Sequence, residues 1–145
     1  MNELNGKKCV LLDFYEGAYG PTIRIDIQSR EDLIKIRNIF LKLSQKPNEE
    51  TNLADCKNVK SIGVNKFVLM SIPDNQETEK KLFLVINKKT IFEFLWKLSV
   101  GNWETIVLLA DNLIEQDKPG HQYLTEEGID DALVELAYRE YRPHE

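Results

Sequence analysis

Two amphipathic segments with the same apolar spacing constrain the fold most strongly. In the first segment, residues 29–43, the apolar stripe consists of Leu33, Ile36, Ile39, Phe40 and Leu43. In the second segment, residues 102–115, it consists of Trp103, Ile106, Leu109, Ala110 and Leu113, each seventy positions later. This spacing is typical of a helix that buries one face. Ser29 and Asn102 are the expected N-caps. The match indicates an internal duplication, and chance is the alternative.

Segments with strand character flank each expected helix. Residues 9–14 and 22–27 precede the first helix, and residues 81–86 and 90–98 precede the second. The clean alternation of residues 22–27 is typical of a half-buried strand. After the first helix, residues 59–64 and 66–72 predict a hairpin around Asn65. After the second helix, residues 121–125 read as a strand. Residues 132–141 suit either a strand or a helix, and the parallel with the first half favours a strand.

The sequence therefore predicts an α+β fold in one domain, residues 1–145. Two hairpin–helix–hairpin (ββαββ) units, residues 7–72 and 80–142, would be joined by the polar linker 73–79. An antiparallel sheet with both helices on one face would let every element bury its apolar side.

Composition indicates a globular cytoplasmic protein. Apolar residues make up 42 % of the chain and charged residues 30 %. No apolar run approaches the ~20 residues that cross a bilayer, and the first residues lack a signal-peptide pattern. Cys9 and Cys56 have no zinc-ligand spacing, and we expect both to be reduced thiols. A membrane association is therefore not expected.

Negative charge is concentrated at the end of the chain. Residues 98–145 contain eleven Asp and Glu but three Lys and Arg, whereas residues 1–97 contain thirteen and sixteen. Carboxylates interleaved with tyrosines suit a basic protein partner, because charge steers the encounter and aromatic side chains anchor it. The candidate partner-binding residues are His121, Tyr123, Glu126, Glu127, Asp130 and Asp131. The alternative is a solvated acidic face with its tyrosines in the core.

Catalytic, metal-binding and nucleic-acid-binding motifs are not found. His121 and His144 are the only histidines, and no nucleophile elbow, phosphate-binding loop or EF-hand loop is present. The lysines in the middle of the chain are too sparse for a nucleic-acid surface. We predict no catalytic residue, no metal and no cofactor. The alternatives are a small-ligand binder or enzyme that uses a groove between the two units, and a homodimer formed through strand edges.

The last third of the chain resembles bacterial polymorphic-toxin immunity proteins. The resemblance is carried by Trp103, by the run Pro119-Gly-His-Gln-Tyr-Leu-Thr125 and by Asp130-Asp-Ala-Leu-Val-Glu-Leu136. It implies a small, acidic, cytosolic, non-enzymatic protein that neutralises a toxin domain, commonly a basic nuclease, by binding it. It implies no role for any individual residue.

Overall fold

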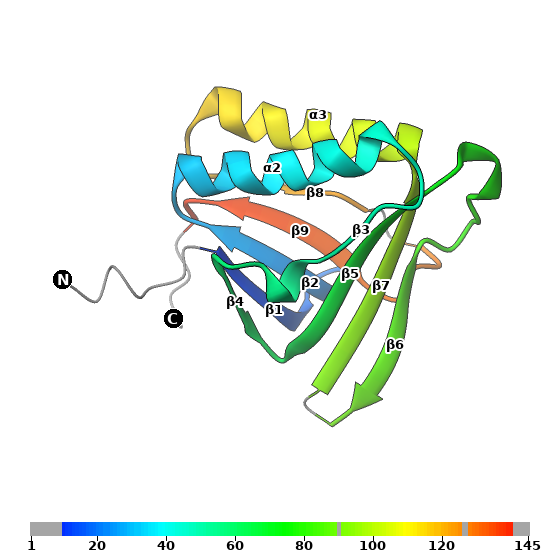
Figure 1. Ribbon diagram of the computed structural model, residues 1–145. Coiled ribbons are helices and arrows are strands. Elements are labelled where there is room, and N and C mark those ends of the chain that lie inside the picture. The colour runs from blue at the N-terminus through cyan, green and yellow to red at the C-terminus, as the bar shows by residue number, and fades with distance from the viewer. Residues whose placement is uncertain (1–9, 90, 126–127, 141–145) are drawn as a thin grey trace.

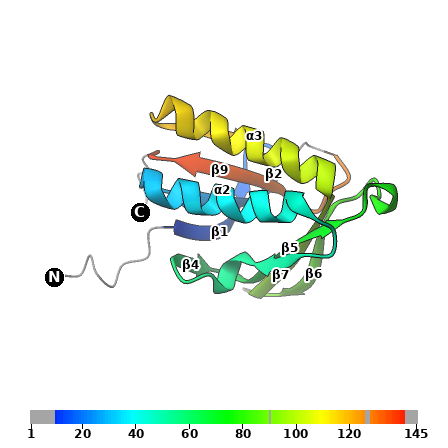
Figure 2. The same ribbon diagram turned by 45° about the horizontal axis from the view of Figure 1, so that its top comes forward.

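Two antiparallel helices pack side by side across two β-sheets (Figures 1 and 2). The computed structural model describes residues 10–89, 91–125 and 128–140. Helix α2 spans Arg30–Gln45 and helix α3 spans Val100–Gln116. Arg37 of α2 joins the helices, because its Nε lies 2.8 Å from Oδ1 of Asp111 on α3. The predicted α+β class with two helices is confirmed.

Both helices begin at a serine cap. The Ser29 hydroxyl accepts a hydrogen bond from the backbone N–H of Asp32 at 3.1 Å, as predicted. The second prediction, Asn102, is wrong: the Ser99 hydroxyl caps α3 by accepting from the Asn102 backbone N–H at 3.2 Å. The helix therefore begins one turn earlier than its apolar stripe suggests. Ser99 also lies seventy residues after Ser29, which extends the sequence parallel between the halves.

The strands form two sheets. The first sheet has the order β4-β1-β2-β9-β8, and the second has the order β3-β5-β7-β6. The strands of the first sheet are β4 (Val59–Ile62), β1 (Val10–Gly17), β2 (Gly20–Ile27), β9 (Leu133–Tyr138) and β8 (Gly120–Tyr123). Those of the second are β3 (Glu50–Asn52), β5 (Val64–Ile72), β7 (Ile91–Ser99) and β6 (Leu82–Lys88). Two short 3₁₀ turns cover Leu53–Asp55 and Asp74–Gln76. Within the ambiguous segment 132–141, residues Leu133–Tyr138 thus form a strand.

Each half of the chain contributes its last strand to the sheet of the other half. The hairpins β1–β2 and β6–β7 are antiparallel, as predicted. Strand β9 then pairs parallel with β2, and β5 pairs parallel with β7. The predicted antiparallel sheet is therefore wrong, since both sheets are mixed. Apolar periodicity shows which face of a strand is buried, but it does not show which strand lies beside it.

The predicted hairpin around Asn65 is also wrong. Strand β4 lies parallel to β1 in the first sheet, whereas β5 belongs to the second. Between them Gly63 has a φ of 79°, a left-handed conformation that glycine adopts without strain. The chain uses this turn to pass from one sheet to the other.

An aromatic cluster links the helices to the second sheet. The ring of Trp103 on α3 lies 5.9 Å from that of Phe40 on α2 and 4.9 Å from that of Trp96 on β7. Trp96 in turn stacks on Phe67 of β5 at 5.9 Å. The core therefore fills the space between the helices and both sheets. In the described part of the chain, neither helix has the combined length and apolarity needed to cross a membrane.

Candidate functional site

Four of the six residues predicted to bind a partner lie in the described part of the chain. His121 and Tyr123 lie on β8, at the edge of the first sheet. Asp130 and Asp131 are hydrogen-bonded to the start of β6, at the edge of the second sheet. Glu126 and Glu127 lie outside the described residues.

His121 and Tyr123 belong to a charged network on the first sheet. The Nδ1 of His121 lies 2.7 Å from a carboxylate oxygen of Glu140, and its ring meets that of Tyr123 edge-on. Burial, followed by the nearby charge of Glu135, raises the pKa of Tyr123. The tyrosine ring also meets that of Tyr19 edge-on. Both predicted contact residues therefore already interact with neighbours in the sheet.

The centre of this network is a buried carboxylate. Glu135 is 4 % exposed and lies directly opposite Arg24 in the β2–β9 register. Its Oε1 accepts a hydrogen bond from the Tyr15 hydroxyl at 2.8 Å and lies 3.9 Å from Nε of Arg24. Arg24 also reaches Glu140, with Nη2 at 3.4 Å. Burial and the Glu135 carboxylate together raise the pKa of Tyr15 to about 12.

The same cluster has donor atoms that suit a metal, but a cation already lies among them. Ligand atoms of His121, Glu135 and Glu140 lie within 4.8 Å of one another. Nitrogen and carboxylate oxygen are common ligands of divalent metals. Here the Arg24 guanidinium lies against both carboxylates and balances their charge. We therefore assign the cluster a structural role.

Asp130 and Asp131 bind the open edge of strand β6. Asp130 Oδ1 accepts from the backbone N–H groups of Lys81 and Leu82 at 2.7 and 3.0 Å. Asp131 Oδ2 accepts from the N–H of Leu84 at 2.7 Å, and its Oδ1 lies 2.7 Å from Nζ of Lys80. An unpaired strand edge invites association with other chains, and these carboxylates cover its donors. They hold the β8–β9 connection against the second sheet.

We expect Asp131→Asn to lower the free energy of unfolding by about 1–2 kcal/mol near neutral pH, because it weakens a charge-assisted bond and an ion pair. Burial raises the pKa of Asp131, but the bonds from Lys80 and Leu84 outweigh it and hold the pKa below its ordinary 3.8. The stabilisation is thus present above pH 3.8 and is lost as pH falls through the lower folded value. Urea unfolding at several pH values measures it.

The matched control for this variant is Glu115→Gln, which neutralises an exposed carboxylate on α3. We expect the control to change stability by less than about 0.5 kcal/mol. A cost for Asp131→Asn that stays constant from neutral pH to well below 3.8 would contradict the assigned ionic role.

The outer face of the second sheet carries an apolar row that the sequence analysis missed. The pairing registers place Val68 of β5, Leu95 of β7 and Phe83 of β6 side by side. All three are half-buried, and among the described residues none belongs to the core or packs against it. The neighbouring Val85, at a bulge of β6, is 58 % exposed. A signal was present in the nearly continuous apolar run of residues 91–98, which predicts a strand with two apolar faces.

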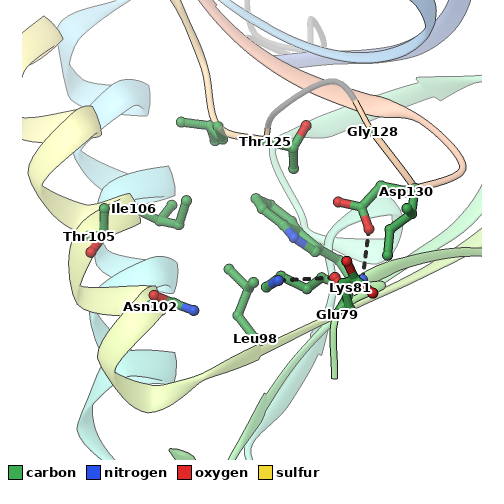
Figure 3. A pocket seen from close by; sticks show the side chains of 12 residues that line it. Glu79, Lys81, Leu98, Asn102, Thr105, Ile106, Thr125, Gly128 and Asp130 are labelled. Atoms are coloured by element: carbon green, nitrogen blue, oxygen red, sulfur yellow. Dashed lines mark hydrogen bonds between the residues drawn. The ribbon is translucent and has the colours of Figure 1, made fainter. Parts of the chain in front are cut away.

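A cavity of about 400 Å³ opens between β7, α3 and the β8–β9 connection (Figure 3). Its deeply buried lining residues are Trp96, Leu98, Ile106 and Leu124. Its polar lining residues are Glu79, Lys81, Asn102, Thr105, Thr125 and Asp130. The cavity lies within residues 79–130, whereas the predicted groove was between residues 7–72 and 80–142. Periodicity marked the two walls as buried elements but did not show that they leave space between them.

Cys9 lies outside the described residues, and the thiol of Cys56 shows no sign of activation. Cys56 is half-buried, and burial followed by the charge of Asp55 raises its pKa. A raised pKa keeps the sulfur protonated, whereas a nucleophilic cysteine needs the thiolate. This agrees with the expected role as an ordinary thiol.

Comparisons with protein-family models, with curated proteins and with solved structures gave no match.

Proposed function

We propose that this chain is a non-enzymatic protein-binding module and that the partner docks on the outer face of the second sheet. The observation that carries the proposal is the row Val68–Leu95–Phe83, which lies outside the core. Sheets with one face on the core usually present polar residues on the other. An apolar outer row, flanked by charged residues, is characteristic of an interaction surface.

The charges around this row favour a partner with acidic groups. The Nζ atoms of Lys80 and Lys97 lie 5.4 and 5.5 Å from the centre of the Phe83 ring. Lys66 and Glu93 oppose each other in the register, so their charges offset. Lys80 is paired with Asp131 at 2.7 Å, and the register puts Glu50 on the same face, so the local positive charge beside the aromatic anchor comes from Lys97. A partner that presents an apolar strip beside carboxylates would complement it in shape and charge.

This differs from the basic partner proposed for the acidic C-terminal region. Asp130 and Asp131 bind the β6 edge, and Glu135 is buried against Arg24. Carboxylates that are already hydrogen-bonded lose internal contacts if they turn to a partner, so they make poor primary contacts. The immunity-type role, in which the chain covers a toxin, belongs to the proposal and is supported by the resemblance of the last third of the chain. Both the contact surface and the charge expected of the partner therefore differ from the sequence-based prediction.

We further infer that the scaffold arose by duplication of one ββαββ unit. The stripe positions Ile39 and Leu109 are half-buried in the two helices, and the other four positions of each stripe are buried. The sheet orders also correspond: each has a hairpin, then the last strand of the other half, then an edge strand. Strand β4 is the addition to the first half. Chance similarity of two helices would not predict matching strand order as well.

The test uses one substitution on the face and a matched one elsewhere. Leu95→Glu places a negative charge in the centre of the row, and Leu108→Glu places the same charge at a 66 % exposed position of α3. We expect Leu95→Glu to weaken the complex with the native partner at least ~30-fold, as loss of a central anchor does. Leu108→Glu should bind as the native chain does. Circular dichroism should show the same fold for both.

The partner is identified by cross-linking in the cells that produce this chain, and affinity is then measured with purified components. If Leu95→Glu binds as tightly as the native chain, the outer face is not the docking surface and the proposal is wrong. If sedimentation shows a native dimer that Leu95→Glu dissociates, the face joins two copies of the chain and the proposed heterologous partner is rejected.

A further inference from the structure

One wall of the cavity carries an unused hydrogen-bond donor. The Trp96 side chain is fully buried, and among the described residues its Nε1 has no hydrogen-bond partner. The neighbouring Trp103 differs, because its Nε1 donates to the carbonyl oxygen of Met70 at 3.1 Å. Buried donors are almost always satisfied, since an unpaired one costs its full desolvation penalty. The space next to Trp96 therefore calls for an occupant with an acceptor.

The walls around this donor are apolar in depth and polar at the rim. Leu98, Ile106 and Leu124 are each less than one-tenth exposed and line the cavity beside the indole. Figure 3 shows Asn102 on the α3 wall and Thr125 on the β8–β9 connection. Asn102 donates its amide N–H to Glu77, which leaves its Oδ1 as an acceptor. A ligand that fits must have an apolar body with both an acceptor and a donor.

The charged residues at the rim favour an uncharged ligand. Glu79 and Asp130 are negative and Lys81 is positive, and Lys81 and Asp130 are engaged in hydrogen bonds inside the protein. Lys81 Nζ donates to the carbonyl of Glu79 at 3.0 Å, and Asp130 Oδ1 accepts from two backbone N–H groups. A charged ligand would meet both signs at the rim and an apolar floor below, where charge is costly.

We propose that this cavity binds a small, planar, uncharged cyclic amide, in which a ring carbonyl lies next to a ring N–H. The carbonyl oxygen accepts from Trp96 Nε1, and the ring packs among Leu98, Ile106 and Leu124. The ligand N–H faces the polar wall, where Asn102 Oδ1 is an acceptor. A volume of about 400 Å³ is within the usual range for a small-molecule site. The site is separate from the outer face of the second sheet and does not depend on the protein partner.

Pyridone is the probe, because it is a planar cyclic amide; toluene and benzoate are ring compounds of similar size without the amide. The two tryptophans give an internal control, since their indole N–H groups give separate proton–nitrogen signals in the same sample. Pyridone should shift the Trp96 signal downfield and saturably, while the Trp103 signal, already bonded to Met70, should move little. We expect pyridone to bind about fivefold more tightly than toluene, the effect of one hydrogen bond. Benzoate should bind more weakly still.

Paired variants test the donor itself. Trp96→Phe keeps an aromatic ring and removes the N–H, so pyridone affinity should fall about fivefold, to the level of toluene. Trp103→Phe removes an N–H that is bonded inside the protein, and pyridone affinity should stay unchanged.

Three results would overturn the proposal. In the first, no probe moves the Trp96 signal, which would mean that water alone satisfies the donor. In the second, toluene binds as tightly as pyridone. In the third, benzoate binds most tightly, which would assign the cavity to anions. The comparison of the three probes on the native chain decides the matter even if Trp96→Phe fails to fold.

Discussion

Trp103→Ala is expected to lower the free energy of unfolding by about 4 kcal/mol, as truncation of a fully buried aromatic side chain does. Trp103 is completely buried and stacks on Phe40 of the neighbouring helix at 5.9 Å. Its edge meets Trp96 of the second sheet at 4.9 Å, and its Nε1 donates to the Met70 carbonyl. One side chain thus joins α3 to α2 and to two strands. The substitution leaves a cavity in the centre of the core.

Two further variants separate packing from the hydrogen bond. Trp103→Phe keeps much of the packing and loses the bond to Met70, so we expect a loss of about 1–2 kcal/mol. Leu108→Ala, on the exposed side of the same helix, should change stability by less than about 0.5 kcal/mol. Urea unfolding followed by circular dichroism measures all three. A Trp103→Ala loss as small as that of Leu108→Ala would show that the aromatic cluster does not hold the helices to the sheet.

The helices and their buried faces could be read from the sequence because helical periodicity is a local signal. Ile39 and Leu109 occupy the same place in the two stripes, and the structure leaves both half-buried. Hairpins with short turns could be read for the same reason. Strand exchange could not, because β2 and β9 are more than a hundred residues apart and their pairing depends on which strands the helices bring together. Two matching repeats could each keep their own strands or could exchange them, and the repeat pattern does not distinguish these arrangements.

The candidate site was predicted less well because charge in a sequence does not reveal its partners. Asp130 and Asp131 looked like surface acids, yet they bind backbone groups 47 to 49 residues away along the chain. No pattern of residue types marks a carboxylate that covers a strand edge. The cavity was equally hidden, since the unsatisfied Trp96 donor becomes visible only when its surroundings are known. Residue type suggests what a side chain can do, and three-dimensional contacts decide what it does.

Glu135→Ala is expected to lower the free energy of unfolding by about 3–5 kcal/mol, the usual cost of removing one partner of a buried ion pair. Arg24 would keep its positive charge with its side chain 11 % exposed and would lose the buried one of its two balancing carboxylates, which lies opposite it on the neighbouring strand. Its Nε already has no hydrogen-bond partner among the described residues, and the variant would also remove the carboxylate that lies 3.9 Å from this nitrogen. The Tyr15 hydroxyl would also lose its acceptor.

The pH dependence of stability distinguishes this ionic role from simple loss of packing. Burial and the Glu135 carboxylate raise the pKa of Tyr15 from 10.0 to about 12, so the folded chain holds the phenol proton more tightly than the unfolded chain. This contribution is complete below pH 10 and is lost as pH rises from 10 towards 12. Glu135→Gln keeps the side-chain volume but removes the charge, so its stability should decline less steeply over that interval. Equal slopes for the native chain and Glu135→Gln would mean that the carboxylate does not hold the Tyr15 proton. The buried pair would then act through packing alone.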